Sequence, residues 1–203
     1  MSTITLCYSP DCETISFAAA ELERYLKAVN PAFAFSHASE SSAANDCTIH
    51  LNTDLDPELS SGLDSRADDL FLISLSNGKG SIQGSNPRSV LLGMYAFLRR
   101  LGYRFLLPDE TVMPHQLSLA DLTCSYSHRA SLRHRGVCIE GADSLENVLD
   151  FIDWLPKLGF NSFFLQFKEP YIFLERWYHH TESNKGSHGT HGSIPAGLLQ
   201  KNA

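Results

Sequence analysis

The chain has 203 residues, of which 43% are hydrophobic, enough for the core of a globular protein of one large domain or slightly more. Its formal net charge is −7 and its sixteen lysines and arginines are scattered, which argues against nucleic acid as a partner. No apolar run reaches the length of about eighteen residues that a membrane span needs, and the N-terminus lacks a basic segment followed by a long apolar one. The sequence therefore predicts a cytoplasmic protein with no membrane partner.

The cysteines and histidines offer little sign of a metal site. The five cysteines are odd in number, lie in apolar settings and show no paired metal-ligand spacing, which favours reduced core residues. Cys7 and Cys12 are the only close pair, so a disulfide between them is the less favoured alternative. The histidines between residues 179 and 191 lie in a Gly-rich stretch without an HExxH pattern, which indicates a surface loop. We expect neither a metal nor a cofactor.

The first half of the chain predicts a sheet and one helix. Residues 4–8 alternate as a strand, and apolar positions three or four apart over residues 15–29 indicate a helix that ends at Asn30-Pro31. The run Asn77-Gly78-Lys79-Gly80 is typical of a hairpin turn. Further strands are expected at residues 33–35, 47–52, 70–75 and 81–84, with a Ser-rich loop over 36–46 and an acidic loop over 55–69.

A second helix follows this sheet. Pro87 stands near its first position, where a missing N–H is tolerated, and Gly102 ends the apolar pattern of residues 88–101. Five strands and two helices predict an α+β domain over residues 1–125, with a mixed β-sheet and both helices packed on one face.

Residues 132–167 have the pattern strand, loop, helix, strand. An apolar run over residues 132–139 ends at Glu140 and Gly141. Ser144 is the expected N-cap of a helix whose C-terminal end is marked by Gly159, and residues 161–167 form a second apolar strand. Strand, helix and strand within about forty residues predict a right-handed βαβ crossover with parallel strands.

The run GSIQGSNPRSVLLGMYAFLRRLGYRFLLPDETVMP, preceded by AAAELERYL, resembles a domain of known enzymes. It is similar to the non-catalytic α/β domain that precedes the barrel in β-hexosaminidases, α-glucuronidases and related bacterial glycoside hydrolases. The matching positions are Gly84, Arg88, Gly93, Gly102, Tyr103, Arg104 and Pro108. Arg135-Gly136 then leads into the next strand, as an "RG" pair does in that superfamily. The resemblance covers about residues 4–180.

This resemblance implies a hexosaminidase domain-2-like fold over residues 1–125. It also implies the first strand-helix-strand of a (β/α)₈ barrel over residues 126–180. In hexosaminidases the loop after the first barrel strand carries an Arg that holds sugar hydroxyls, whereas this chain has Ala142-Asp143-Ser144 there, so the resemblance does not establish acetylhexosamine specificity.

The length after Leu132 is far below the roughly 250 residues of a complete barrel. Residues 181–203 are rich in Gly, Ser, His and Asn without an apolar period, which predicts a flexible tail. We expect an N-terminal fragment of a glycoside hydrolase that acts on carbohydrate, without the catalytic carboxylates and without activity by itself.

The carboxyl ends of barrel strands carry the functional side chains, which gives two groups of candidate substrate-binding residues. Glu140 and Asp143 follow the first strand, and Gln166, Lys168 and Glu169 follow the second. An ion pair with an arginine such as Arg135 is the alternative for Glu140, and a solvated pair is the alternative for Lys168 and Glu169.

Trp177 and Tyr178 could stack on a sugar face, although aromatic residues at helical spacing are more often part of a core. They could also form the partner surface of a different kind of protein, a non-enzymatic carbohydrate- or protein-binding α/β module. In a partial barrel the strands over 132–139 and 161–167 lack part of their covering, which predicts self-association through the exposed barrel edge.

Overall fold

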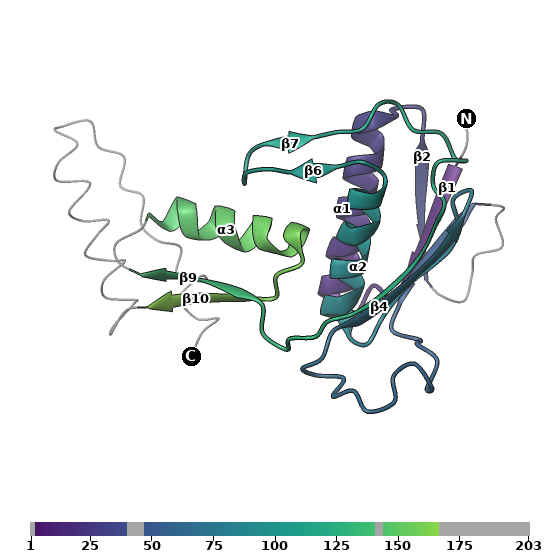
Figure 1. Ribbon diagram of the computed structural model, residues 1–203. Coiled ribbons are helices and arrows are strands. Elements are labelled where there is room, and N and C mark those ends of the chain that lie inside the picture. The colour runs from purple at the N-terminus through teal and green to yellow at the C-terminus, as the bar shows by residue number, and fades with distance from the viewer. Residues whose placement is uncertain (1–2, 40–46, 141–143, 167–203) are drawn as a thin grey trace, which may run out of the picture.

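The computed structural model describes residues 3–39, 47–140 and 144–166, with Glu140 and Gln166 described by their backbone. These residues form a body made of a six-stranded sheet and two long helices (Figure 1). Beside it lies a smaller part, in which a third helix packs with a pair of strands.

The six-stranded sheet is mixed and has the order β2-β1-β3-β5-β4-β8. β2, β1, β3 and β5 are parallel, whereas β4 is antiparallel to both of its neighbours, β5 and β8. The strands are β1 (Thr3–Tyr8), β2 (Ala34–Ala38), β3 (Thr48–Asn52), β4 (Leu70–Ser76), β5 (Lys79–Gly84) and β8 (Cys124–Arg129). The predicted mixed sheet in an α+β fold is confirmed.

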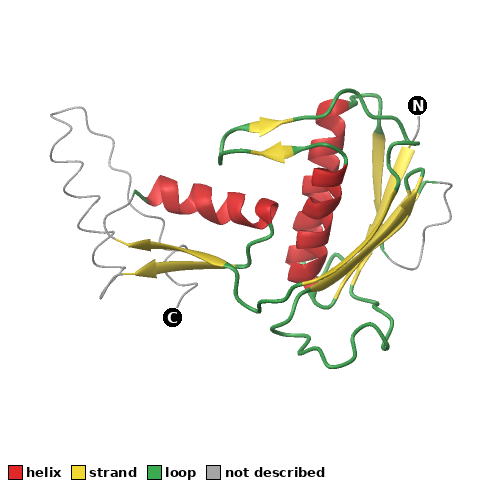
Figure 2. Ribbon diagram, in the orientation of Figure 1, coloured by secondary structure: helices red, strands yellow, loops and turns green. Residues whose placement is uncertain are grey.

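Both long helices, α1 (Glu13–Val29) and α2 (Pro87–Arg100), cover the same face of this sheet (Figure 2). Pro87 begins α2 as predicted, and the side chain of Asn86 caps the helix by accepting a hydrogen bond of 2.9 Å from the N–H of Ser89. At Gly93 the helix comes so close to the sheet that an added Cβ would lie 3.1 Å from the side chains of Ile82 and Phe71. The core therefore lies between the helix pair and the sheet.

The hairpin between β4 and β5 follows the prediction. Asn77 and Gly78 both have positive φ, 51° and 76°, which the primed two-residue turns of hairpins require. β2 is longer than predicted, because it continues to Ala38 and includes residues expected in the Ser-rich loop.

The smaller part is a βαβ unit. β9 (Gly136–Glu140) and β10 (Ser162–Gln166) are parallel and are joined by α3 (Leu145–Leu158). Ser144 caps α3 by accepting a hydrogen bond of 3.1 Å from the N–H of Asn147, and Gly159 ends the helix with φ of 93°. Both caps and the parallel pairing agree with the prediction.

Three expectations need correction or extension. The strand expected from residue 132 begins only at Gly136. Residues 103–114, expected to be an exit from α2, contain a short hairpin of β6 (Arg104–Phe105) and β7 (Thr111–Val112). Sequence reasoning also missed β8, which pairs with β4 along its whole length, so the boundary expected after residue 125 falls inside a strand of the sheet.

The two faces of the β9–β10 pair differ in their covering. Phe163 lies under α3, where its ring stacks on Phe151 at a centroid distance of 6.4 Å. On the other face Phe164 is 53% exposed, and on α3 the side chain of Ile152 is 50% exposed. The βαβ unit thus leaves large apolar side chains open to solvent.

Candidate functional site

The carboxyl ends of β9 and β10 bring two of the candidate residues together. Glu140 and Gln166 are register partners and form the last pair of the two strands. Both strands run away from the six-stranded sheet, so this pair lies at the end remote from the α+β domain (Figure 1). The other candidates, Asp143, Lys168, Glu169, Trp177 and Tyr178, lie outside the described residues.

The amino ends of the same strands are fastened to the α+β domain through Arg135 and Asn161. The guanidinium Nη2 of Arg135 donates to Oδ2 of Asp69 at 2.6 Å, and Nδ2 of Asn161 donates to the same oxygen at 2.7 Å. Oδ1 of Asn161 accepts from the backbone N–H of Arg135 at 2.9 Å. The sequence offers Arg135 as an ion-pair partner for Glu140, but in the structure Arg135 pairs with Asp69, at the opposite end of β9.

Asp69 receives further donors from α2. Its Oδ1 accepts hydrogen bonds from Nε of Arg88 at 3.0 Å and from Oγ of Ser89 at 2.8 Å. The residue is only 2% exposed, and its carboxylate lies between two arginines that come from different parts of the chain. We call Asp69, Arg88, Ser89, Arg135 and Asn161 the Asp69 cluster.

The electrostatics of the Asp69 cluster favour a charged carboxylate. Burial alone raises the pKa of Asp69, because it disfavours the ionised form. The donors from Arg135, Arg88, Ser89 and Asn161 together outweigh burial and hold the pKa below its usual range. Asp69 is therefore ionised at neutral pH and acts as an acceptor for four donors, not as a proton donor.

A second ion pair lies next to this cluster on the surface. Asp68 accepts a hydrogen bond of 2.8 Å from Nε of Arg133, which lowers the pKa of Asp68. The backbone oxygen of Arg133 in turn accepts from Nδ2 of Asn161 at 2.8 Å. Two adjacent carboxylates of the α+β domain thus contact the segment that leads into β9.

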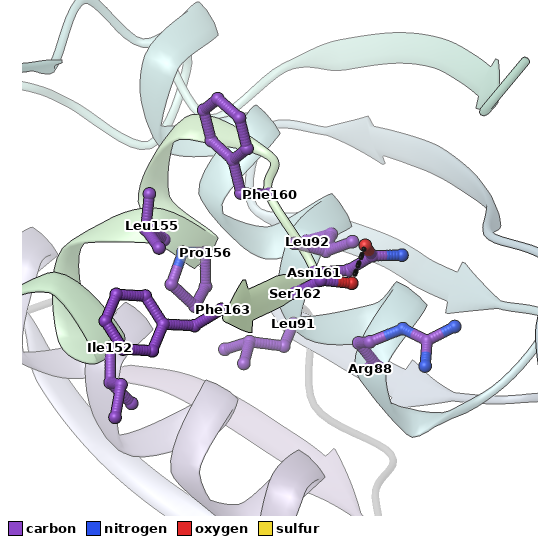
Figure 3. Close-up of a pocket in the computed structure, with 10 residues that line it drawn as sticks. All are labelled: Arg88, Leu91, Leu92, Ile152, Leu155, Pro156, Phe160, Asn161, Ser162 and Phe163. Atoms are coloured by element: carbon purple, nitrogen blue, oxygen red, sulfur yellow. Dashed lines mark hydrogen bonds between the residues drawn. The ribbon is translucent and has the colours of Figure 1, made fainter. Parts of the chain in front are cut away.

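An apolar cleft of about 260 Å³ lies between α2 and the βαβ unit (Figure 3). Its apolar lining comes from Leu91, Leu92, Ile152, Leu155, Pro156, Phe160 and Phe163. Arg88, Asn161 and Ser162 line the polar side, and Arg88 and Asn161 already bind Asp69. Apart from Arg88 the lining carries no charged group, so the cleft does not offer the pair of carboxylates that glycoside hydrolysis needs.

The described residues contain no group of three or more His, Cys, Asp or Glu side chains placed to hold a metal ion. Within the same part of the chain, no helix has both the length and the apolar character that crossing a membrane requires. Cys7 is buried, whereas Cys138 on β9 is exposed, so the expectation that all five cysteines are core residues does not hold for Cys138.

Asp69 is the residue that sequence reasoning missed. The sequence places it at the end of the acidic loop over 55–69, although the resemblance includes both Arg88 and Arg135. Two partly buried arginines require an acceptor for their hydrogen bonds. The pair Asp68-Asp69, directly before an apolar strand, is the sequence signal that indicates such an acceptor.

A scan against protein-family models finds no match for this chain, and a search of curated proteins finds none either. Any functional assignment therefore rests on the residues and on the geometry of the fold.

Proposed function

We propose that residues 3–166 form the supporting α+β domain and the first strand-helix-strand unit of a glycoside hydrolase related to β-hexosaminidases and α-glucuronidases. The observation that carries the proposal is the orientation of the β9–β10 pair. The amino ends of these parallel strands are fastened to the α+β domain, while their carboxyl ends carry Glu140 and Gln166 and are directed away from it. Barrel enzymes bind substrate at the carboxyl ends of their strands.

Four residues of the resemblance, Gly84, Arg88, Gly102 and Arg135, support this proposal because the structure gives each of them a role. At Gly84 an added Cβ would lie 2.5 Å from the backbone nitrogen of Val90, so α2 can begin where it does only if this side chain is absent. Gly102 has φ of 107°, which favours glycine at the end of α2. Arg88 and Arg135 share the carboxylate of Asp69. The motif thus describes how α2, the sheet and β9 are joined.

The chemistry at the carboxyl ends favours a substrate-binding role for Glu140 and Gln166. Hydrolysis of a glycosidic bond needs two carboxyl groups, about 5–10 Å apart, on either side of the bond. Among the described residues, the last pair of β9 and β10 consists of one carboxylate residue, Glu140, and one amide residue, Gln166. We therefore assign the catalytic pair to later strands of such a barrel and expect no turnover by residues 1–203 alone.

Expression of the longest translated product that contains this sequence tests the proposal. Aryl glycosides, including an N-acetylhexosaminide and a glucuronide, are offered to that product and to the 203-residue chain. We expect turnover of at least one substrate by a longer product and none by the 203-residue chain. Turnover by the 203-residue chain that is lost in Glu140→Gln contradicts the assignment, as does a folded longer product that hydrolyses none of the substrates.

The exposed apolar side chains favour a second candidate, a non-enzymatic module that binds a carbohydrate or a protein. Phe164 on β10 and Ile152 on α3 are more than a third exposed, as are Leu149 and Leu132. Such a surface also favours self-association of the isolated chain. A folded 203-residue chain that stays monomeric and binds an oligosaccharide without hydrolysing it would favour this candidate.

A further inference from the structure

The α+β domain and the βαβ unit meet in two places. On one side α3 packs against α2, and the indole Nε1 of Trp154 donates a hydrogen bond of 3.2 Å to the backbone oxygen of Phe105. On the other side the contact is polar: Asp69 accepts from Arg135 and Asn161, and Asp68 pairs with Arg133. The backbone oxygen of Asp69 also accepts from the N–H of Ala130 at 2.8 Å, at the point where the chain leaves the sheet for β9.

Asp69 is the buried one of the two carboxylates in this polar contact, and Asp68 pairs with Arg133 on the surface. Asp69 faces Arg88 from α2, and Arg135 together with Asn161 from the amino ends of β9 and β10. The neighbouring charges are those of Asp68 and Arg133, which pair with each other, and of Arg129 at the end of β8, which acts on Asp68. If Asp69 becomes neutral, the Arg88 and Arg135 guanidinium groups are left side by side without their shared counter-charge.

The loss of the Asp69 charge affects Arg88 in the α+β domain and Arg135 in the βαβ unit differently. Arg88 has a second acceptor, the backbone oxygen of Ala67, within the α+β domain. The other acceptors of Arg135, the backbone oxygens of Leu132 and Gly159, lie within the βαβ unit and its connecting segment. Asp69 is thus the only described side chain of the α+β domain that holds Arg135 across the junction.

We propose that Asp69 is an acid-sensitive latch. In its ionised form it fastens the βαβ unit to the α+β domain, and its neutralisation releases the unit while the six-stranded sheet and its two helices remain folded. This inference does not rest on the proposed hydrolase function, because every contact in it lies within the described chain.

Tryptophan fluorescence of the full chain can report the release. The chain has two tryptophans, so Trp177→Phe leaves Trp154, which lies at the junction, as the only one. In this background Asp69→Asn removes the charge of the latch with little change in shape. The matched control is Asp68→Asn, which removes the adjacent carboxylate that pairs with Arg133 on the surface.

At neutral pH we expect Asp69→Asn to shift Trp154 emission to longer wavelength, with far-UV circular dichroism unchanged. Trypsin should cut between residues 129 and 135 about tenfold faster or more, because cleavage follows the population of the released form. Asp68→Asn should match its parent in both measurements. On acidification the parent should show the same emission shift before its circular dichroism changes, whereas Asp69→Asn should show no further shift.

Two outcomes would overturn the proposal. In one, Asp69→Asn keeps the parent's emission and resistance to trypsin. In the other, Asp69→Asn loses its circular dichroism, so Arg135→Gln is measured in its place. That variant leaves the contacts between Asp69 and Arg88 intact, and the proposal fails if it folds with unchanged Trp154 emission. If Asp69→Asn fails to fold, release by a folded Arg135→Gln supports the latch.

Discussion

Removal of one hydroxyl group tests how the two long helices are held together. Tyr95 on α2 is buried, and its hydroxyl donates to Oε2 of Glu21 on α1 at 2.8 Å. Glu21 is buried as well, and its carboxylate also accepts two hydrogen bonds from Arg24, at 2.7 and 2.9 Å. Burial and the negative charge of Glu21 raise the pKa of Tyr95, so the phenol stays protonated and remains a donor.

Tyr95→Phe removes this donor and keeps the ring. A hydrogen bond to a charged group contributes about 1.5–3 kcal/mol, so we expect the free energy of unfolding to fall by about that amount. Urea unfolding followed by far-UV circular dichroism measures it as a lower midpoint at constant slope.

Tyr103→Phe is the matched control. The Tyr103 hydroxyl donates to the backbone oxygen of Tyr25 at 2.6 Å, an uncharged acceptor on the same helix α1. Its loss should lower the free energy of unfolding by only about 0.5–1.5 kcal/mol. In a Glu21→Gln background Tyr95→Phe should have a smaller effect, with a coupling of about 1 kcal/mol, whereas Tyr103→Phe should be additive. If Tyr95→Phe costs no more than Tyr103→Phe and the cycle is additive, the charged tie contributes nothing.

Four further outcomes are expected. Gly84→Ala should lower the urea midpoint more than Gly93→Ala, because the new Cβ meets backbone atoms of α2 at 2.5 Å in the first case and side chains at 3.1 Å in the second; equal midpoints would contradict this. A chain that ends at residue 129 should melt at a higher temperature than one that ends at residue 125, because β8 then keeps its pairing with β4; equal melting temperatures would mean that β8 adds nothing. The pKa of Asp69 is lowered in the folded protein, so its contribution to stability is present above the usual carboxyl pKa of about 3.9 and is lost as pH falls through the pKa of the folded state. Acidification should therefore lower the urea midpoint of the parent more than that of Asp69→Asn. Phe164→Glu should reduce self-association of the full chain in light scattering, whereas no change would exclude the exposed face of β10 as the contact.

Local sequence signals were enough to predict most of the elements. The hairpin at Asn77-Gly78, the cap at Ser144 and the helix end at Gly159 each depend on residues within one turn of the chain. The alternation of apolar residues in β1 and β4 likewise comes from neighbours in the sequence. At these positions the local signals decide the backbone conformation, and tertiary contacts do not override them. The corresponding predicted elements therefore agree with the structure.

β8 escaped prediction because its pattern is that of an edge strand. Its sequence, CSYSHR, is largely exposed and carries no continuous apolar run. It is held by pairing with β4 and by Tyr126, whose ring lies against Phe71 and under the guanidinium of Arg100 at 3.4 Å. Phe71 and Arg100 are far away in the sequence, so the spacing of residues within β8 does not reveal them.

The Asp69 cluster could not be predicted either, because its members are also far apart in the sequence. Its partners lie 19, 20, 66 and 92 positions away from Asp69 along the chain. Other hydrogen bonds of the cluster residues Arg135 and Asn161 explain why β9 begins at Gly136 and not at Leu132. The backbone oxygens of Leu132 and Arg133 accept from Arg135 and Asn161 at this junction, and this use of the segment replaces strand pairing.

The length of β9 connects this junction with the candidate site. From Arg135 to Glu140 an extended strand spans about 16 Å, so a rotation of about 4° at the amino end moves the carboxyl end by about 1 Å. In an enzyme a misplacement of about 1 Å can lower the rate about a hundredfold. If Glu140 and Gln166 contact a substrate, we expect a change in the Asp69 cluster to shift their position, although the cluster lies at the other end of the strands. The α+β domain would then help to set the geometry of the site through its junction with the βαβ unit, in which the buried carboxylate of Asp69 is one contact beside those of Trp154 and Asp68.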